Sequence, residues 1–294
     1  MSDDADVFDL DRRAVRASFD RASTDYEAAA VLQARVADEL LDRLDAFEFR
    51  PDTVLDLGSG PGRATALLKR KYRSALVIAL DLAPGMLQEA RRHQRLFHRF
   101  QRVCADASRL PFADASVDVI FSSLMLQWCD LDSTFAEARR VLKPTGFFAF
   151  STFGPDTLKE LRASWAEVDD YQHVNQFMDM HDVGDALVGA GLVEPVLDIE
   201  RMKLTYADVM ALMRDLKTIG AHNVTAGRAR GLTGKSRLEK MQSAYEAFRQ
   251  DNRLPATYEI VYGAAWGAAG RRGARAVDGE VRISPGDIRR RVTP

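Results

Sequence analysis

The sequence predicts an α/β fold, in which a mostly parallel sheet carries helices on both faces. Short apolar runs alternate with helical patterns from about residue 53 to residue 152, which is the rhythm of βαβ units. One run, Ala75–Leu80, is apolar throughout, as expected of a strand buried on both faces. A glycine-rich turn, Gly58–Gly62, follows the first strand, and open α/β sheets bind ligands at the carboxyl ends of their strands.

The first half of the chain supplies the alternation. A helix is expected from about 12 to 47, because Leu32, Val36, Leu40 and Leu44 recur at every fourth position. Pro51 and Asp52 end that pattern. The strands then expected are 53–57, 75–80, 102–105, 117–122 and 147–152, and the helices between them are 63–72, 84–97 and 131–142.

The second half departs from this rhythm. Helices are expected at 155–168 and 181–190, followed by a strand at 193–199 and a largely helical stretch at 205–250. In that stretch Val209, Leu212, Met213 and Leu216 follow the spacing of a helix with one buried face. A last strand is expected at 256–266. The tail from residue 267 has four glycines before residue 280 and few large apolar residues, so we expect it to be poorly ordered.

Composition and charge narrow the functional classes. The 294 residues are 46% hydrophobic and 29% charged, and the formal net charge is -2, which gives no overall positive field for nucleic acid or an anionic membrane. The acidic start of the chain is unlike a signal peptide, and no run approaches the roughly 18 apolar residues of a membrane span. The two cysteines and five histidines lack disulfide or metal spacing. We expect a cytoplasmic monomer that binds no nucleic acid, membrane or metal.

The strongest chemical signal is the turn after the first strand. Its glycines, Gly58, Gly60 and Gly62, are spaced G-x-G-x-G with Ser59 between the first two. Glycine lets a backbone approach a ligand where a Cβ would collide. The spacing differs from the G-x-G-x-x-G of dinucleotide binders, and no P-loop lysine follows. Asp56, just before the turn, suits a cationic ligand that a pyrophosphate site would repel. The alternative is a plain tight turn.

Two more carboxylates end the next two strands. Asp81 lies 21 residues after Gly60 (81 − 60), the spacing at which an acid binds the hydroxyls of a ribose. Asp106 can accept a hydrogen bond from an adenine amine, while Ala107 leaves room for the ring. Each acid alone can also be explained as a helix cap or turn residue. Three acids on one edge of the sheet favour a nucleoside site more strongly than any one of them.

The segment Ser122–Trp128 follows the fourth strand and is expected to form the floor between cofactor and substrate. Its Met125 and Trp128 have two possible roles, lining a site or filling the core. For these two side chains we favour the core.

Together these residues resemble the motifs of class I methyltransferases. The resemblance covers residues 12–152 and includes the glycine turn, Asp81, Asp106-Ala107 with Leu110-Pro111-Phe112, and the turn Leu142–Gly146. It implies a Rossmann-like fold whose seven-stranded sheet has an antiparallel last strand, a role that suits 256–266. It also implies S-adenosyl-L-methionine as the cofactor.

The resemblance assigns the cofactor site residue by residue. Arg21 and Tyr26, in the stretch that starts Phe19-Asp20-Arg21-Ala22, are expected in a helix that covers the methionine end of the cofactor. The full set implied is Arg21, Tyr26, Asp56, Gly58, Ser59, Gly60, Gly62, Asp81, Leu82, Met86, Asp106, Ala107, Ser122 and Gln127.

Further stretches are similar to one branch, the malonyl-acyl-carrier-protein O-methyltransferases of biotin synthesis. They are Leu126–Cys129, Phe153–Leu158, Asp215–Asn223, Gly227-Arg228 and Thr257–Glu259, which extend the resemblance from about 12 to 266. The implied organisation is one domain at 1–266, with a cofactor-binding core at 12–152, substrate-side elements at 153–255 that include a helical insert at 201–253, the last strand at 256–266, and a disordered tail at 267–294.

The resemblance implies methyl transfer to the free carboxylate of a malonyl thioester on acyl carrier protein or coenzyme A. Such a carboxylate, with a pKa of about 4, is already ionised at neutral pH, so no catalytic base is expected and the enzyme acts by positioning. Lys217, His222 and Arg228 are the candidates for holding the carboxylate or a carrier phosphate. They lie in segment 201–240, which has nine Lys or Arg and three acids, and this segment is either a carrier-docking surface or a solvated helical face.

Three alternatives stay open at this stage. The chain also shares stretches with the complex I assembly factors, which are thought to modify an arginine. A methyltransferase for another small carboxylic acid would carry the same cofactor motifs. So would a non-catalytic module that only binds S-adenosylmethionine.

Overall fold

The computed structural model describes residues 11–47, 50–96, 98–221 and 234–269, with the backbone of 275–277 and 280–282. A seven-stranded sheet crosses the described chain in the order β3-β2-β1-β4-β5-β7-β6. The strands are β1 (Thr53–Leu57), β2 (Leu76–Asp81), β3 (Gln101–Cys104), β4 (Val117–Ser123), β5 (Leu142–Phe153), β6 (Val193–Tyr206) and β7 (Leu254–Trp266). Only β7 runs against its neighbours, β5 and β6. The expected seven-stranded, mostly parallel sheet is confirmed.

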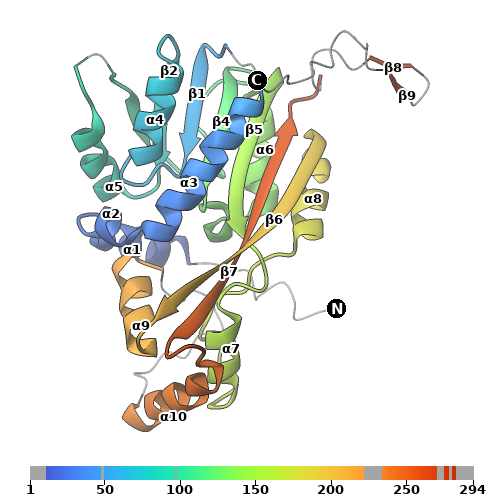
Figure 1. Ribbon diagram of the computed structural model, residues 1–294. Helices are drawn as coiled ribbons and strands as arrows, with labels where there is room; N and C mark the ends of the chain where they lie inside the picture. The colour runs from blue at the N-terminus through green and yellow to red at the C-terminus, as the bar shows by residue number, and fades with distance from the viewer. Residues whose placement is uncertain are drawn as a thin grey trace, which may run out of the picture.

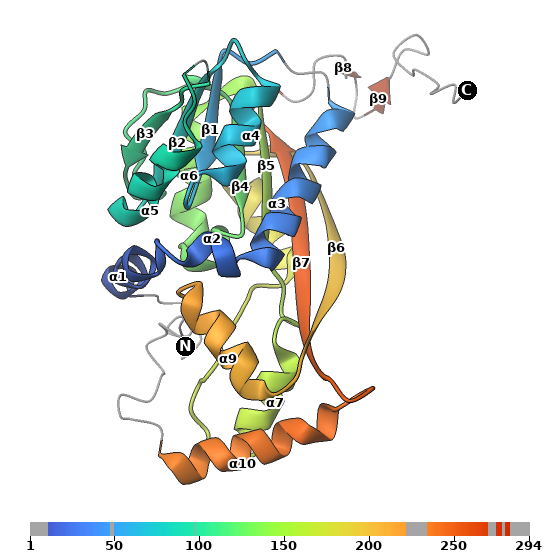
Figure 2. The ribbon, with the colours of Figure 1, turned by 60° about the vertical axis from the view of Figure 1, so that its left-hand side comes forward.

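Helices cover both faces of the sheet because alternate strand residues point to opposite sides. On one face, Val54 of β1 packs in a core with residues of α3 (Val31–Arg43), α4 (Arg63–Lys71) and α5 (Pro84–Glu89). On the other, Leu55 packs with residues of α6 (Leu131–Val141) and α8 (Met180–Gly189). Figures 1 and 2 show the resulting three layers. Both Val54 and Leu55 are fully buried.

The single N-terminal helix expected at 12–47 is wrong. The chain instead forms α1 (Arg12–Ala22), α2 (Tyr26–Ala29), α3 and a 3₁₀ turn at Leu44–Ala46. The break falls at Ser23–Asp25, where serine, threonine and aspartate compete with helical hydrogen bonding through their own side chains. The break lets α1 lie across the carboxyl edge of the sheet, while α3 packs along its face (Figure 2).

The strand expected at 193–199 extends to Tyr206, so the helical stretch expected from 205 begins later than predicted. Met202, Leu204 and Tyr206 alternate with polar residues, and this two-residue period indicates a strand. The rest of that stretch contains α9 (Val209–Thr218) and α10 (Lys235–Tyr245). Strands β6 and β7 extend beyond the carboxyl ends of β1 and β4, and α7 (Lys159–Ala166), α9 and α10 lie around this extension (Figures 1 and 2).

Several smaller boundaries also differ from expectation. The helix expected at 84–97 is α5 followed by a 3₁₀ turn at Ala90–His93, and β5 begins at Leu142 rather than 147. Of the tail, the structure describes only 267–269 and the backbone of a short antiparallel pair, β8 (Arg275–Val277) with β9 (Glu280–Arg282). Within the described residues, every helix is too short or too polar for a membrane span. Cys104 and Cys129 are both free thiols.

Candidate functional site

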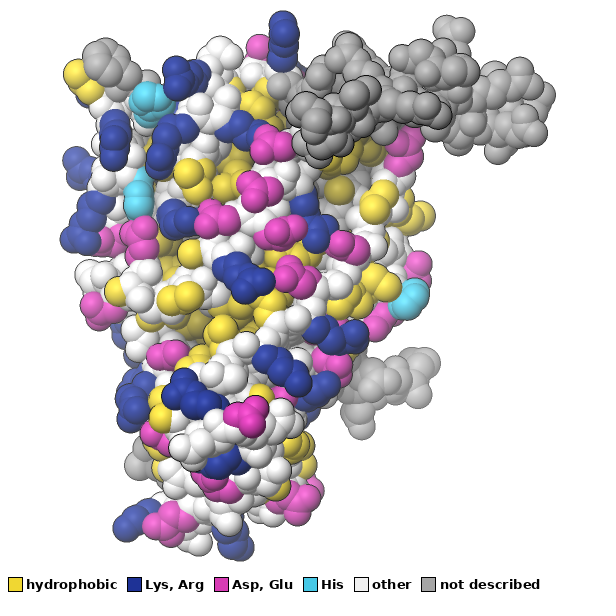
Figure 3. Space-filling view, in the orientation of Figure 1, with side chains coloured by type: hydrophobic (Ala, Val, Ile, Leu, Met, Phe, Trp, Pro, Cys, Tyr) yellow, Lys and Arg dark blue, Asp and Glu magenta, His cyan; other side chains and the backbone are white. Residues whose placement is uncertain are grey.

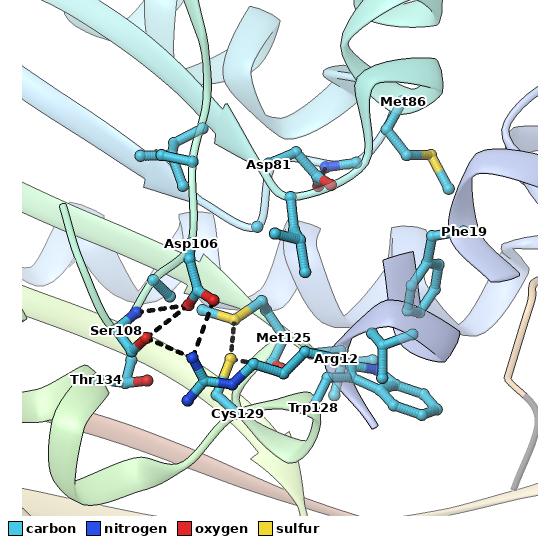
Figure 4. Close-up of a pocket in the computed structure, with 18 of the residues that line it drawn as sticks. Arg12, Phe19, Asp81, Met86, Asp106, Ser108, Met125, Trp128, Cys129 and Thr134 are labelled. Carbon is cyan, nitrogen blue, oxygen red and sulfur yellow. Dashed lines mark hydrogen bonds and ion pairs between the residues drawn. The ribbon is translucent and has the colours of Figure 1, made fainter. Parts of the chain in front are cut away.

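A cavity lies at the carboxyl edge of the sheet, between α1 and the ends of β1, β2 and β4 (Figure 4). It contains about 810 Å³ of empty space, open solvent included. Eight of the fourteen residues expected to bind the cofactor line it: Tyr26, Gly58, Gly60, Asp81, Leu82, Met86, Asp106 and Ala107. Segments far apart in the sequence therefore meet at one site, as the strand-end positions predicted.

The glycine turn forms the wall nearest β1 and β2. The amides of Gly58 and Ser59 both donate to the carbonyl of Leu80, at 2.8 and 2.9 Å, which binds the turn to the neighbouring strand. Gly58 has φ +77°, and a Cβ there would lie 2.2 Å from Cγ of Met125. Only glycine avoids both the backbone strain and the overlap. The turn therefore brings backbone, without side chains, to the cavity surface.

Asp81 holds the turn in place. One carboxylate oxygen accepts from the amide of Gly60 at 2.8 Å, and the other accepts from the amide of Ala83 at 2.8 Å. The helix that follows, α5, has no side-chain cap, so the alternative of a helix N-cap for Asp81 is wrong. Burial raises the pKa of Asp81 to about 6, and the nearby charge of Asp20 acts in the same direction. The two hydrogen bonds lower the pKa and offset part of this rise.

Asp56 lies beneath the turn with only 1% of its surface exposed. Its carboxylate accepts a hydrogen bond from the hydroxyl of Thr65. Burial, with the nearby charge of Asp81, raises the pKa of Asp56 to about 7. Two carboxylates with elevated pKa values on either side of the glycine turn are suited to a positively charged ligand, since a cation would stabilise their ionised forms.

Replacing Asp56 by asparagine is expected to stabilise the ligand-free protein at pH 8. The unfolded carboxylate ionises near pH 3.8, whereas the folded one ionises near 7, so Asp56 makes the free energy of unfolding fall as pH rises between these values. The full cost is about 4 kcal/mol at about 1.4 kcal/mol per pKa unit, with the Thr65 hydrogen bond already included, and the poorer fit of an amide in place of the carboxyl group offsets part of the gain. We expect a gain on the order of 2 kcal/mol in urea unfolding at pH 8.

At pH 5 this gain should shrink, because the folded wild-type protein then carries a protonated, neutral Asp56. Asp106 provides the control, since its pKa is lowered: burial raises it, but hydrogen bonds from Ser108 and the charge of Arg12 outweigh burial. Asp106→Asn should therefore lose stability at pH 8, the opposite sign. An Asp56→Asn variant that is less stable than wild type at pH 8 would contradict the assignment.

Asp106 faces the cavity from the end of β3 and is already engaged by two neighbours. One oxygen accepts from the amide and hydroxyl of Ser108, and the other accepts from Arg12 of α1 at 3.0 Å (Figure 4). The contact with the Ser108 amide shows that the turn interpretation of Asp106 also holds. The Arg12 ion pair closes one end of the cavity with a side chain that lies 94 positions away in sequence.

Aromatic and sulfur-containing side chains form the opposite wall. Phe19 of α1 and Trp128 pack edge to face with ring centroids 5.3 Å apart, and both line the cavity beside Met125. Trp128 therefore lines the cavity, contrary to the core role favoured for it, whereas Met125 lines the cavity and also packs against the core beneath it. The ring of Tyr26 lies at the same wall, and burial raises the pKa of its hydroxyl, with a further contribution from Asp81. The wall is apolar enough to shelter a reaction from water.

A second cavity, with about 850 Å³ of empty space that includes open solvent, adjoins the other side of the glycine turn. It shares Tyr26, Gly58, Gly60 and Ser123 with the first, so the two form one elongated cleft around the turn. Asp56 and Ser59 line this second part. The Ser59 hydroxyl is buried and has no hydrogen-bond partner among the described residues. Gln33 and Arg63 also face this part of the cleft.

Four predicted cofactor residues lie outside both cavities. Arg21 is exposed on α1, where its guanidinium donates to the carbonyl of Ala17. The Ser122 hydroxyl donates to the carbonyl of Leu57 and so links β4 to the end of β1, whereas the Gln127 amide donates to the carbonyl of Leu124 and holds the loop after β4 in shape. Gly62 caps α4 with φ +85°. These contacts give the four residues local structural roles, and their part in cofactor binding stays a prediction.

The predicted substrate-binding residues are divided. Lys217 is exposed on α9 and lines neither cavity. His222 and Arg228 lie outside the described residues. Among the described residues, no cluster of three or more His, Cys, Asp or Glu side chains could hold a metal ion.

Sequence reasoning missed Arg12, Phe19, Gln33 and Arg63 as cavity residues. The sequence contains only a weak signal for Arg12 and Phe19. These two residues and Val15 recur on one face of α1, but the sequence around them does not indicate what that face covers. The arrangement as a whole can hold a cationic ligand with sugar and base groups along three carboxylates, beside an apolar wall.

Comparisons with known proteins agree with this arrangement. Residues 55–150 match the family described as methyltransferase domain. The chain is 52% identical over 269 residues to the malonyl-[acyl-carrier protein] O-methyltransferase of Methylovorus sp. (strain MP688), which covers 89% of this chain and 91% of the relative. It is also 52% identical over 283 residues to the enzyme of the same name from Laribacter hongkongensis (strain HLHK9), covering 93% and 95%.

Solved structures support the fold. The YcgJ protein from Bacillus subtilis superimposes with a TM-score of 0.55 at 18% identity, covering 80% of this chain and 98% of that one. A putative methyltransferase from Bacillus halodurans C-125 superimposes with a TM-score of 0.54 at 17% identity, covering 78% and 97%. The Rossmann-like fold expected from the sequence is thus confirmed.

Proposed function

This chain belongs to the family of malonyl-[acyl-carrier protein] O-methyltransferases, and we propose that it transfers a methyl group from S-adenosyl-L-methionine to the free carboxylate of a malonyl thioester on acyl carrier protein. The observation that carries the proposal is the 52% identity to a relative of that name across about nine-tenths of both chains. The product, a malonyl methyl ester, has its charge masked and so suits the start of an acyl chain in biotin synthesis.

The cleft fits S-adenosylmethionine. Asp81 would accept hydrogen bonds from the ribose hydroxyls, and Asp106 with Ala107 would receive the adenine. Asp56, Ser59 and the glycine turn would hold the amino-acid end, and the unpartnered Ser59 hydroxyl gains a partner there. A sulfonium and an ammonium are both cationic, which the ionised forms of Asp56 and Asp81 stabilise. When bound, S-adenosylmethionine supplies an electrophilic methyl group.

The chain's own contribution to the reaction is alignment and exclusion of water. The malonyl carboxylate, with a pKa of about 4, needs no base to become nucleophilic at neutral pH. Phe19, Met125 and Trp128 form the wall that would keep water from the reacting groups. Positioning of this kind can contribute roughly 7–11 kcal/mol to lowering a barrier.

A methyl-transfer assay tests the proposal directly. The protein is incubated with methyl-labelled S-adenosylmethionine and malonyl carrier protein, and the carrier is analysed by mass spectrometry. We expect a labelled, base-labile ester on the malonyl group. Acetyl carrier protein, which has no free carboxylate, should remain unlabelled. Binding of S-adenosylmethionine without any ester on malonyl carrier protein or malonyl coenzyme A would reject the proposed acceptor.

A further inference from the structure

The segment that directly follows α9 packs against α1 beside the cleft. The hydroxyl of Ser18 in α1 donates to the carbonyl of Gly220, just after α9, in a buried hydrogen bond of 2.9 Å. Gly220 has φ +72°, and a Cβ there would lie 3.2 Å from Cβ of Ala22. Glycine therefore allows the end of α9 to close against α1. In Figures 1 and 2, α9 lies directly beside α1 and α2.

The two helices bury one face and expose another. Val15 and Phe19 of α1 face the cleft, while Val209 and Leu212 of α9 are buried. Most of the exposed positions are basic: Arg13, Arg16 and Arg21 on α1, with Arg214 and Lys217 on α9. We call these five residues the α1–α9 basic surface. Every one lies within about 10 Å, measured along its helix axis, of the Ser18–Gly220 contact.

The acids on these helices do not neutralise the surface. The two helices hold six Lys or Arg and only two Asp, in a chain whose net charge is -2. Asp20 accepts from the amide of Gly85 at 2.7 Å, and Arg16 is 3.9 Å from it. Asp215 is hydrogen-bonded to Tyr206. Among the described residues, Arg13, Arg214 and Lys217 form no ion pair.

We propose that the α1–α9 basic surface docks the acyl carrier protein that delivers the malonyl group. This inference rests on the proposed function, because it assumes a substrate tethered to a carrier. Carrier proteins are small and acidic, and they present the acyl group on a long flexible arm, so docking must occur near the mouth of the cleft. The surface has the required charge, and the same helix α1 carries cleft-lining side chains on its inner side. Complementary charge of this kind mainly accelerates encounter and fixes orientation.

Charge reversal tests the docking surface. Arg13→Glu with Arg214→Glu changes two exposed side chains that line neither cavity and form no side-chain hydrogen bond or ion pair within the described part of the chain. We expect kcat/KM for malonyl carrier protein to fall by about tenfold or more at low salt, with the difference narrowing as ionic strength rises. With malonyl pantetheine, an acceptor without the carrier, kcat/KM should stay within about twofold of wild type.

The chain offers a matched control on another basic surface. Arg70, at the end of α4, and Arg91, in the turn after α5, are also exposed, and Figure 3 shows Lys, Arg and His side chains gathered over this part of the molecule. Arg70→Glu with Arg91→Glu changes the net charge by the same amount. It should leave turnover of malonyl carrier protein nearly unchanged. An equal or larger loss in this control would overturn the assignment, because the effect would then reflect net charge or docking elsewhere.

Direct titration separates this inference from the proposed function. Calorimetry with malonyl carrier protein measures docking without turnover. Wild-type activity that survives unaltered in the Arg13/Arg214 variant would overturn the docking surface and leave the function intact. No turnover of any malonyl thioester by wild type would reject the function, and equal carrier affinity of the wild type and the variant would still overturn the surface.

Discussion

Replacing Asp81 by asparagine is expected to raise the Kd for S-adenosylmethionine by about 100-fold or more. Hydrogen bonds to a charged group contribute about 1.5–3 kcal/mol each, and the carboxylate is proposed to accept two from the ribose. Asparagine keeps the size of the side chain but offers only one oxygen. In addition, its amide group would oppose the amide of Gly60 or Ala83, each of which now donates to Asp81 at 2.8 Å. Calorimetry with S-adenosylmethionine measures the change.

Asp56→Asn and Asp106→Asn are the control variants for the affinity loss expected of Asp81→Asn. Each removes one carboxylate from the same cleft, but neither carboxylate accepts a hydrogen bond from the glycine turn. We expect Asp81→Asn to have the largest effect on affinity because it affects both the sugar contacts and the shape of the turn. If Asp81→Asn bound S-adenosylmethionine as wild type does while remaining folded, the cleft would not be a nucleoside site.

The sequence was sufficient to predict those strands whose apolar runs match their buried positions in the sheet. The strands β1, β2 and β4 are short apolar runs whose ends carry Asp56, Asp81 and the Ser122–Trp128 segment, and the parallel arrangement then puts those ends on one edge. Cavity residues that depend on contacts between distant segments could not be predicted from the sequence. Arg12 reaches Asp106 across 94 positions, and no periodicity within α1 reveals that contact.

The errors have similar physical causes. The apolar spacing from Leu32 to Leu44 lies wholly after the break at Ser23–Asp25, so it supported α3 but gave no reason to extend the same helix back to residue 12. The alternating residues at the end of β6 were overlooked because a helical pattern begins three residues after Tyr206. The cofactor role of Arg21 stays a prediction: its side chain is exposed on α1, and its position relative to the cleft depends on how α1 crosses the sheet edge.

Alanine substitutions at two glycines of the same turn are expected to affect different properties, cofactor binding at Gly60 and stability at Gly62. Gly60→Ala should lose cofactor binding by about 100-fold or more while costing only about 1 kcal/mol of stability. Gly60 has φ +52°, which imposes a modest penalty on alanine, and nothing lies within 4 Å of the added Cβ. That open space belongs to the cleft, since Gly60 lines both cavities. The methyl group therefore meets the ligand and leaves the protein uncrowded.

Gly62→Ala should instead destabilise the fold by about 3 kcal/mol or more. At φ +85°, its Cβ would lie 2.7 Å from Cβ and 3.1 Å from Cα of Ala90, and a backbone atom cannot move aside cheaply. Gly62 lines neither cavity, so the molecules that remain folded should still bind S-adenosylmethionine. Urea unfolding and calorimetry on both variants separate the two outcomes. A Gly60→Ala protein that binds normally would mean that the ligand does not approach this backbone, and the assignment of the turn would have to be abandoned.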